Sequence, residues 1–478
     1  MQLSDMYYRA LVSKDTRFDG VFFVGVKSTG IYCRPVCPVR TPNREGCLFF
    51  SRAAEAEQEG FRACFRCRPE LAPGQASVDA CSNLVRMAVE QIQAGFLNEH
   101  NVDELAGRLG VTARHLRRSM DQELGMTPSF LAQSRRLAMA KQLLQETALS
   151  MTDVAFSSGF SSVRRFNGAF RKQFRCTPSS LRKKKKKLEQ PEDSISLRLD
   201  YRPPLPWKEI LAGCQFRAMK GLEHVDGDTY YRTVRWGTKI GWCSLKPVPK
   251  QHALHVTLSL SLLGGVIPIL AKLRHKFDLD ANPETIALHL KQDAILEPFV
   301  LSNPGIRLSG AFASFAQMIR VILGQRISVK AATTVCNRLI EAFGEPIETP
   351  FGFLTRVFPS EERLATSPIE DLVALGIPKA RAETIQNLSK SVCSGDIRLD
   401  GSLDTETFSK KLLAIKGIGA WTVRYALMRL FGEPDIFPAS DLELRKALDN
   451  RSVREIEGLA EAWRPWRSYA AMLLWNRG

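Results

Sequence analysis

The sequence predicts a multidomain protein that is mainly helical and contains smaller α+β parts. Three observations indicate this class. The 478 residues exceed what one hydrophobic core usually holds, so three or four domains are expected. Two close cysteine pairs, Cys33-x3-Cys37 and Cys64-x2-Cys67, stand near the N-terminus. Apolar residues recur at helical spacing over 82–182 and again from Glu284 onward, and short alternating runs lie between these segments.

The four cysteines predict the first element. Two pairs about 30 residues apart can close a tetrahedral site of four thiolates, which zinc binds at roughly 2.3 Å. Five arginines flank the pairs: Arg34, Arg40, Arg62, Arg66 and Arg68. A metal site that meets DNA needs such a phosphate-binding surface, whereas a structural zinc knuckle, which is the alternative interpretation, does not.

The segment 15–69 resembles the Ada-type methylphosphotriester-sensing domain of bacterial alkylation-response regulators. We therefore expect a small zinc-bound α+β domain over residues 1–78. The resemblance implies that all four cysteines bind one Zn²⁺ and that Cys33 also accepts a methyl group from a damaged DNA phosphate. Spacing alone does not choose among the four thiols. Arg34 and Arg40 match arginines near the DNA-facing site of that family.

The charge distribution indicates a nucleic-acid partner. The formal net charge is +17, and residues 81–187 hold 19 basic and 8 acidic residues, a net charge of +11. The N-terminus lacks the pattern of a secretory signal. The apolar run 253–270 alternates with Thr257, Ser259 and Ser261, which predicts a half-buried strand that runs into a turn rather than a membrane span. We expect a cytoplasmic, nucleoid-associated protein with no membrane partner.

Residues 81–182 predict two helix–turn–helix units joined by a long helix near 128–146. In each unit a short helix ends at a glycine, Gly110 or Gly159, and a basic helix follows. This stretch resembles the AraC-family DNA-binding domain. The resemblance implies DNA contacts, and the matching positions are Arg114, Arg117, Arg118, Arg164 and Asn167. The alternative is a solvated basic face on a helical bundle. Residues 183–193, rich in lysine, predict a flexible basic linker.

The C-terminal half predicts a small antiparallel sheet subdomain over 194–300 and an all-α domain over 301–478. Within the latter, the run 412–422 places Gly417 and Gly419 between two helices, as in a helix–hairpin–helix. Backbone N–H groups at such a turn can hold a DNA phosphate, and the turn carbonyls can hold a monovalent cation. This signal is modest alone, since many non-enzymatic proteins use it.

Further residues narrow the family. The run 435–446 follows the hairpin by about 20 residues and contains Asp441, and the run 322–329 contains Gln325 and Arg326. Together they resemble the AlkA-type 3-methyladenine branch of the helix–hairpin–helix DNA glycosylases. The resemblance implies that Asp441 is catalytic, and the matching aromatic base pocket consists of Trp421, Tyr425 and Trp475. Cation–π attraction of that pocket favours a cationic N-alkylpurine.

Two positions refine this expectation. Trp421 occupies the place of the nucleophilic lysine of bifunctional lyases, and Lys416 lies on the wrong side of the turn, so we expect a monofunctional hydrolase. Arg326 stands where the best-known relatives insert an apolar wedge into the DNA. This departure leaves the substrate range and the efficiency of base flipping open.

The sequence therefore predicts a fused alkylation sensor, transcriptional activator and DNA repair glycosylase. Its expected partners are double-stranded DNA, both alkylated and promoter DNA, and RNA polymerase, and the chain is expected to be a monomer. Methylation of Cys33 would change a formal cluster charge of −2 to −1 and strengthen binding to the DNA polyanion. The alternative is a transcription regulator whose glycosylase-like half only grips DNA. Direct reversal of O6-methylguanine is disfavoured, because no Pro-Cys-His-Arg run occurs.

Overall fold

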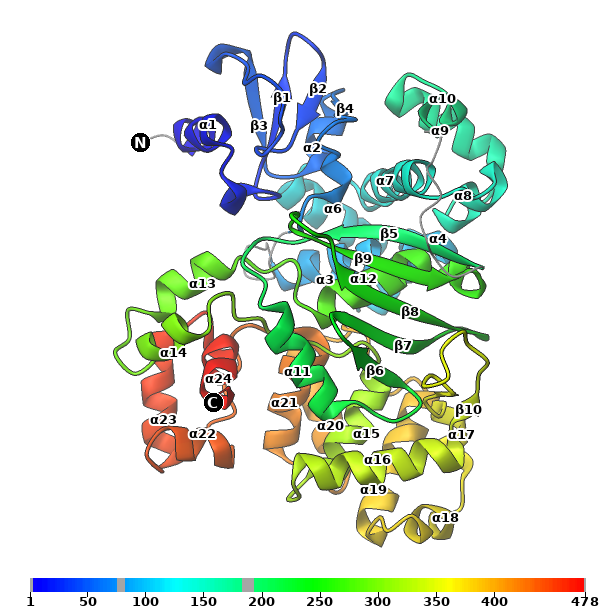
Figure 1. Ribbon diagram of the computed structural model, residues 1–478, viewed down its shortest axis with the longest axis vertical. Helices are drawn as coiled ribbons and strands as arrows, with labels where there is room; N and C mark the ends of the chain where they lie inside the picture. The colour runs from blue at the N-terminus through cyan, green and yellow to red at the C-terminus, as the bar shows by residue number, and fades with distance from the viewer. Residues whose placement is uncertain (1–2, 75–81, 183–192, 477–478) are drawn as a thin grey trace. The chain divides into compact units, whose positions relative to one another are not determined.

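The computed structural model describes residues 3–74, 82–182 and 193–476 (Figure 1). Most of the predicted basic linker, residues 183–192, lies outside these ranges. The chain forms two compact units. The first comprises Met1–Pro203, Val248–Arg274 and Leu279–Asn282, and the second comprises Pro204–Pro247, His275–Asp278 and Pro283–Gly478. Helices dominate both units, as predicted, and the sheets are small.

The first unit begins with a four-stranded sheet in the order β3-β1-β2-β4. Its elements are α1 (Leu3–Ser13), β1 (Phe23–Val26), β2 (Ile31–Cys33), β3 (Cys47–Phe50), α2 (Ala53–Gln58) and β4 (Arg62–Ala63). β1 pairs antiparallel with β2 and β3, and β2 pairs parallel with β4. The parallel pair is important because both of its strands end at a cysteine pair.

Helices make up the next part of the first unit. They are α3 (Asn83–Gln93), α4 (Phe96–Glu99), α5 (Val102–Arg108), α6 (Ala113–Leu124), α7 (Pro128–Glu146), α8 (Met151–Ser157), α9 (Val163–Phe174) and α10 (Pro178–Leu181). Helices α5–α6 and α8–α9 are the two predicted helix–turn–helix units. Thr112 and Ser162 cap the second helix of each unit through their hydroxyl groups. Gly110 and Gly159 adopt the positive φ that each turn requires.

Strands β5 (Ser194–Asp200) and β9 (Ala253–Ser259) pair antiparallel within the first unit, and α7 packs against β5. The prediction of a half-buried strand at β9 was wrong, because both of its faces are buried. Its two hydroxyl side chains have hydrogen-bond partners: Thr257 bonds buried Ser196 at 3.1 Å, and Ser259 bonds exposed Ser261 at 3.0 Å. The chain then turns through a 3-10 helix, η5 (Leu260–Gly265), before α12 (Val266–Lys276) begins.

The second unit contains an antiparallel meander and the C-terminal helices. The meander is formed by β6 (Glu223–Asp226), β7 (Thr229–Trp236) and β8 (Lys239–Pro247), preceded by α11 (Trp207–Arg217). Its helices are α13 (Pro283–Leu290), α14 (Glu297–Ser302), α15 (Ser314–Gly324), α16 (Val329–Phe343), α17 (Glu361–Thr366), α18 (Ile369–Ala374), α19 (Lys379–Cys393), α20 (Thr405–Leu413), α21 (Ala420–Phe431), α22 (Leu442–Ala447), α23 (Val453–Ala460) and α24 (Arg467–Trp475).

A large apolar core joins α15, α16, α19, α20 and α21. This core holds the hairpin between α20 and α21 against α15, α16 and α19. The predicted helical run is interrupted once, by the two-residue strands β10 (Glu345–Pro346) and β11 (Arg356–Val357), where Pro346 cannot continue a helix. Among the described residues, the structure has no helix that is both long and apolar enough for a membrane span.

Candidate functional sites

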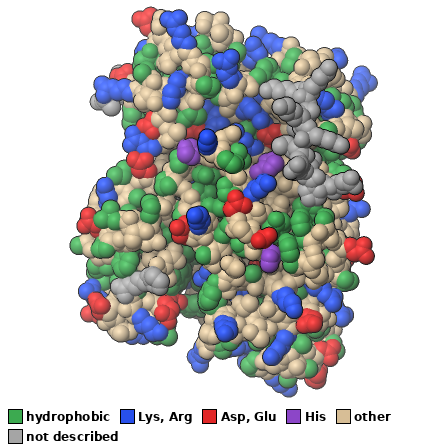
Figure 2. Space-filling view, in the orientation of Figure 1, with side chains coloured by type: hydrophobic (Ala, Val, Ile, Leu, Met, Phe, Trp, Pro, Cys, Tyr) green, Lys and Arg blue, Asp and Glu red, His purple; other side chains and the backbone are tan. Residues whose placement is uncertain are grey.

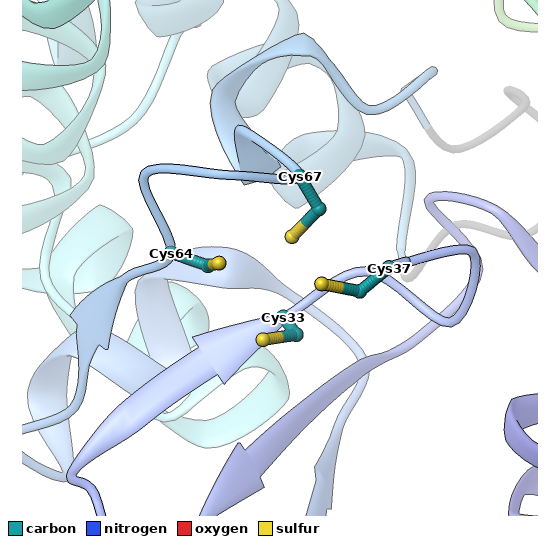
Figure 3. A group of neighbouring side chains, drawn as sticks. All are labelled: Cys33, Cys37, Cys64 and Cys67. Carbon is teal, nitrogen blue, oxygen red and sulfur yellow. The ribbon is translucent and has the colours of Figure 1, made fainter. Parts of the chain in front are cut away.

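The four predicted cysteine ligands come together at one end of the small sheet (Figure 3). β2 ends at Cys33, and β4 ends one residue before Cys64. Because these strands pair in parallel, with Tyr32 opposite Ala63, the two cysteines leave the sheet side by side. Tight turns then return Cys37 and Cys67 to the same point. The parallel register thus explains how two distant pairs form one cluster.

The cluster has the geometry of a four-thiolate metal site. All four sulfur atoms lie within 4.8 Å of one another, and a tetrahedral ion with bonds of about 2.3 Å separates its sulfur ligands by about 3.8 Å. All four side chains are buried. Hydrogen bonding among the thiols, led by Cys33, lowers the pKa of Cys37 to about 7, and the same contacts raise the pKa of Cys33. Four thiolates at this spacing require a cation, and zinc fits the donor set.

Backbone donors also approach the sulfur atoms. The Arg34 amide donates to Cys67 Sγ at 3.4 Å, and the Arg66 amide donates to Cys64 Sγ at 3.4 Å. Cys47 is buried nearby, but it is not one of the four clustered cysteines, and its thiol donates to the Asn43 carbonyl.

The two arginines predicted beside the cluster lie in different environments. Arg40 is exposed. Arg34 is only 7% exposed, and its guanidinium is held by Asp19 and Asp200. Sequence reasoning missed both carboxylates, and no local pattern joins Arg34 to Asp200, which lies 166 residues further along the chain.

A buried lysine, also missed, supports the cluster from the other side. Lys141 of α7 is fully buried and donates to the Cys64 carbonyl at 3.2 Å and to Glu70 at 2.6 Å. Its ammonium group lies over the rings of Phe65 and Phe174. Phe65 stands between two metal-ligand positions, and Phe174 ends α9, so the turn between Cys64 and Cys67 contacts the second helix–turn–helix. A charged residue within the mostly apolar run 137–144 of α7 was the signal available in the sequence.

The predicted DNA-contacting side chains of the helical part lie mostly on the surface. On α6, Arg114, Arg117 and Arg118 are exposed, while Leu116 and Met120 are buried. On α9, Arg164 is exposed and Asn167 is half-buried. The second helix of each unit therefore presents a basic face to solvent. Lysine and arginine side chains are also scattered, with acidic ones among them, over the face of the molecule in Figure 2.

In the second unit, the structure brings Asp441 together with the three predicted aromatic residues. The Trp421 indole N–H donates to Asp441 Oδ2 at 2.9 Å, and the Trp475 indole N–H donates to Oδ1 at 3.0 Å. Oδ1 also accepts the backbone N–H groups of Glu443 and Leu444 at the start of α22. Asp441 is therefore a helix cap and also the anchor of two tryptophans.

The aromatic residues form a continuous arrangement. Trp421 and Tyr425, four residues apart on α21, stack with ring centroids 5.2 Å apart, and Trp475 of α24 lies 5.9 Å from Tyr425. The next residue at this spacing, Arg429, lies 5.8 Å from the Tyr425 ring. A cation thus already lies over the Tyr425 ring, and the sequence-based cation–π argument did not include it.

The hairpin between α20 and α21 is held by side chains of other helices. Gly417 has a φ of +93°, and an added Cβ would lie 2.2 Å from Thr384 Oγ1. Thr384 donates to the Lys416 carbonyl at 2.9 Å, and Gln325 donates to the Gly417 carbonyl at 3.1 Å. An added Cβ at Gly419 would meet nothing within 4 Å. This glycine therefore leaves open space at the start of α21.

Arg326 lies at the tip of the turn between α15 and α16. It is exposed, with a φ of +58°. Arg381 donates to the Leu323 and Gln325 carbonyls and thereby fixes the base of this turn. Ile327, the next residue, is also exposed.

Comparisons with known proteins match several segments of this chain. Family models match four segments: the metal binding domain of Ada at 6–70, a helix-turn-helix domain at 105–184, the AlkA N-terminal domain at 196–313, and the HhH-GPD superfamily of base excision DNA repair proteins at 319–455.

Two curated relatives and one solved structure are informative. The chain is 39% identical to a probable bifunctional transcriptional activator/DNA repair enzyme AlkA of Mycobacterium tuberculosis, over 98% of this chain and 95% of the relative. It is 31% identical to DNA-3-methyladenine glycosylase 2 of Escherichia coli, over 58% of this chain and 95% of that protein. The structure of a 3-methyladenine DNA-glycosylase from Archaeoglobus fulgidus covers 58% of this chain and 96% of its own, with a TM-score of 0.51 at 20% identity, which supports the fold alone.

Proposed function

We propose the activities of this chain from one premise: it belongs to the family of AlkA-type bifunctional transcriptional activators and DNA repair enzymes. The second unit hydrolyses the N-glycosidic bond of N-alkylated purines such as 3-methyladenine in double-stranded DNA. The cysteine cluster takes a methyl group from a DNA methylphosphotriester, and the helix–turn–helix units then activate transcription. The single observation that carries the glycosylase proposal is that Trp421 and Trp475 both bind Asp441 while Tyr425 contacts both indole rings.

The hydrogen bonds of Asp441 indicate its role. A carboxylate has about four acceptor positions. Oδ1 accepts three N–H groups and Oδ2 accepts one, so these four hydrogen bonds fix the orientation of the carboxylate. An anion fixed in this way stabilises the positive charge that develops on the sugar as the base departs. Asp441 is therefore proposed to act by electrostatic stabilisation, and water attacks the sugar.

The reaction is proposed to end at hydrolysis, without cleavage of the DNA strand. Trp421 stands at the lyase position, and its indole is bound to Asp441. Lys416 precedes the turn, where its carbonyl is bound by Thr384. Backbone N–H groups near Gly419 would hold a DNA phosphate, and the remaining lone pairs of the Lys416 and Gly417 carbonyls would contribute to a monovalent cation site. Arg326 would enter the DNA stack at the flipped nucleotide.

For the first unit, the proposed reaction is methyl transfer to Cys33. Zn²⁺ bound by the four cysteines would keep their sulfur atoms deprotonated at neutral pH. Cys33 Sγ attacks the methyl carbon, the bond between that carbon and the ester oxygen breaks, and its electron pair stays on the oxygen, which leaves an ordinary phosphodiester anion. The product is a thioether, so the local negative charge falls by one and the basic faces of α6 and α9 bind DNA more tightly. The exposed Arg40 is proposed to contact the DNA phosphate. RNA polymerase is proposed as the protein partner. The protein is proposed to be a monomer in the cytoplasm.

Two measurements on one protein test both activities. Duplex DNA treated with a radioactive methylating agent is incubated with wild type, Asp441→Asn and Cys33→Ser. We expect Asp441→Asn to lose the release of free 3-methyladenine and to retain label transfer to the protein. We expect Cys33→Ser to lose label transfer and to retain the release of 3-methyladenine. If wild type released no base and Asp441→Asn changed nothing, the alternative of a transcription regulator with an inactive glycosylase-like half would be correct.

A further inference from the structure

An ion-pair network joins the cysteine cluster to strand β5. Arg34 directly follows Cys33, and its Nη1 donates to Asp200 Oδ2 at 2.8 Å, while its Nε donates to Asp19 Oδ1 at 2.8 Å. The side chain of Asp200 is 2% exposed and that of Arg34 is 8% exposed. Arg198, which is more exposed, pairs with Asp200 on its other side. Arg34, Asp19 and Asp200 are therefore buried, and with Arg198 the two positive charges match the two negative ones.

Arg34 also contacts the metal ligands themselves. Its backbone N–H donates to Cys67 Sγ at 3.4 Å, and its guanidinium Nη1 donates to the Cys67 carbonyl at 3.3 Å. The Arg34 carbonyl accepts the Cys37 amide at 3.1 Å. One residue thus fixes the turn between Cys33 and Cys37 and holds it against Cys67. The orientation of its side chain depends on the two carboxylates.

These two carboxylates come from different parts of the sequence. Asp19 lies within the segment that matches the metal binding domain of Ada, at 6–70. Asp200 lies within the segment that matches the AlkA N-terminal domain, at 196–313. Both residues belong to the first compact unit. A residue of the glycosylase-type sequence therefore completes the environment of the cysteine cluster.

We propose that Asp200 is a positioning residue for the four-cysteine site, acting through Arg34, and that Arg34 is a structural support rather than a ligand for DNA phosphate. An arginine whose guanidinium is shared between two buried carboxylates and a carbonyl has little capacity left for a phosphate oxygen. Burial alone lowers the pKa of Arg34, but Asp19 and Asp200 outweigh it and raise the pKa above its ordinary value. The expected effect on methyl transfer rests on the proposed function. The expected effect on the retention of zinc does not.

The test uses the full-length zinc protein and the isosteric variant Asp200→Asn. Residues that support metal ligands typically contribute about 10–100-fold to metal affinity or activity. We therefore expect zinc loss to a competing chelator to be about 10-fold faster, and the rate of methyl transfer to fall by a similar factor. In the cobalt-substituted protein, the thiolate–cobalt absorption bands should shift, because Cys67 is held less well. Release of 3-methyladenine should be unchanged, which also verifies that the protein is folded.

Two further variants make the result specific. Asp19→Asn removes the other carboxylate and should reproduce the same defects. Arg198→Gln leaves the Arg34–Asp200 pair intact and should retain wild-type zinc loss and methyl transfer. If Asp200→Asn does not fold, Arg34→Lys replaces it in the test, because lysine keeps the charge but cannot bridge both carboxylates. The same faster loss of zinc and slower methyl transfer are then expected.

The outcomes distinguish the inference from the function on which it depends. If Asp200→Asn matches wild type in zinc loss and cobalt spectrum, the positioning role is wrong. Faster methyl transfer, or tighter DNA binding by unmethylated Asp200→Asn, would also overturn it, because Arg34 would then be a phosphate ligand that Asp200 blocks. If wild type transfers no methyl group, the proposed function fails, while chelator and cobalt measurements still decide the role of Asp200.

Discussion

The substitution Asp441→Asn tests the electrostatic role of the carboxylate directly. Asparagine is nearly isosteric with aspartate and is an equally good helix cap, so α22 should remain intact. If its oxygen takes the place of Oδ1, it still accepts the backbone N–H groups of Glu443 and Leu444 and the Trp475 indole. Its NH₂ group then faces the indole N–H of Trp421, where the wild-type carboxylate accepts a hydrogen bond at 2.9 Å.

The expected loss has two contributions. The contact between two donors at Trp421 costs about 1–3 kcal/mol. The lost interaction between the carboxylate and a developing unit charge about 4 Å away is about 4 kcal/mol at an effective dielectric constant near 20. The second contribution alone corresponds to a rate about a thousandfold lower. We therefore expect base release by Asp441→Asn to fall at least about a thousandfold.

The assay is single-turnover release of 3-methyladenine and 7-methylguanine from methylated duplex DNA with the protein in excess. Trp421→Phe removes the indole donor but keeps the charge, and should fall only about tenfold, as expected for one hydrogen bond to a charged group. Glu443→Gln, an exposed neighbour on α22, serves as the matched control. An Asp441→Asn rate within tenfold of wild type would refute the electrostatic argument.

Three further predictions concern the hairpin, the buried lysine and the DNA-binding helices. Gly417→Ala should lower the free energy of unfolding by about 1–3 kcal/mol, because its φ of +93° and the proximity of Thr384 both disfavour a side chain; Gly419→Ala, in open space, should not, and equal melting temperatures would contradict this. Lys141→Met should destabilise the first unit by about 1–3 kcal/mol, since buried Glu70 loses its contact with Lys141 and keeps only its pair with Arg68; urea unfolding of wild type and Lys141→Met measures the difference, and equal free energies of unfolding would contradict this. Arg164→Ala should weaken promoter binding and reduce the slope of log affinity against log salt concentration by about 0.9 if Arg164 contacts one phosphate. The control is Arg86→Ala, because Arg86 pairs with Glu90 on α3. If Arg164→Ala changed neither the slope nor the affinity, Arg164 would not belong to the DNA interface.

The sequence was most informative where chemistry and short spacing coincide. The cysteine pairs predicted a four-thiolate cluster, because few other arrangements explain two close pairs, and the structure brings the four sulfur atoms together. Gly110, Gly159 and Gly417 each mark a turn that requires positive φ. The resemblance to AlkA-type proteins selected Asp441 and the aromatic residues that surround it.

Contacts between distant segments were beyond the sequence. Asp200 pairs with Arg34 across 166 positions, and no periodicity connects the two residues. The polar residues of β9 suggested an exposed face, but partner hydroxyl groups allow Thr257 and Ser259 to be buried. No motif in the sequence singled out Arg429, and only the placement of its guanidinium over Tyr425 reveals its proximity to the aromatic residues.

The position of Phe65 limits how far the parts of this protein can change independently. This ring lies between Cys64 and Cys67 and packs against Phe174, whose centroid is 6.3 Å away at the end of α9. Replacing the N-terminal domain by that of another relative would therefore also require compatible residues at 141 and 174. Residues of α7 and α9 would have to evolve in step with a loop that is far from them in the sequence.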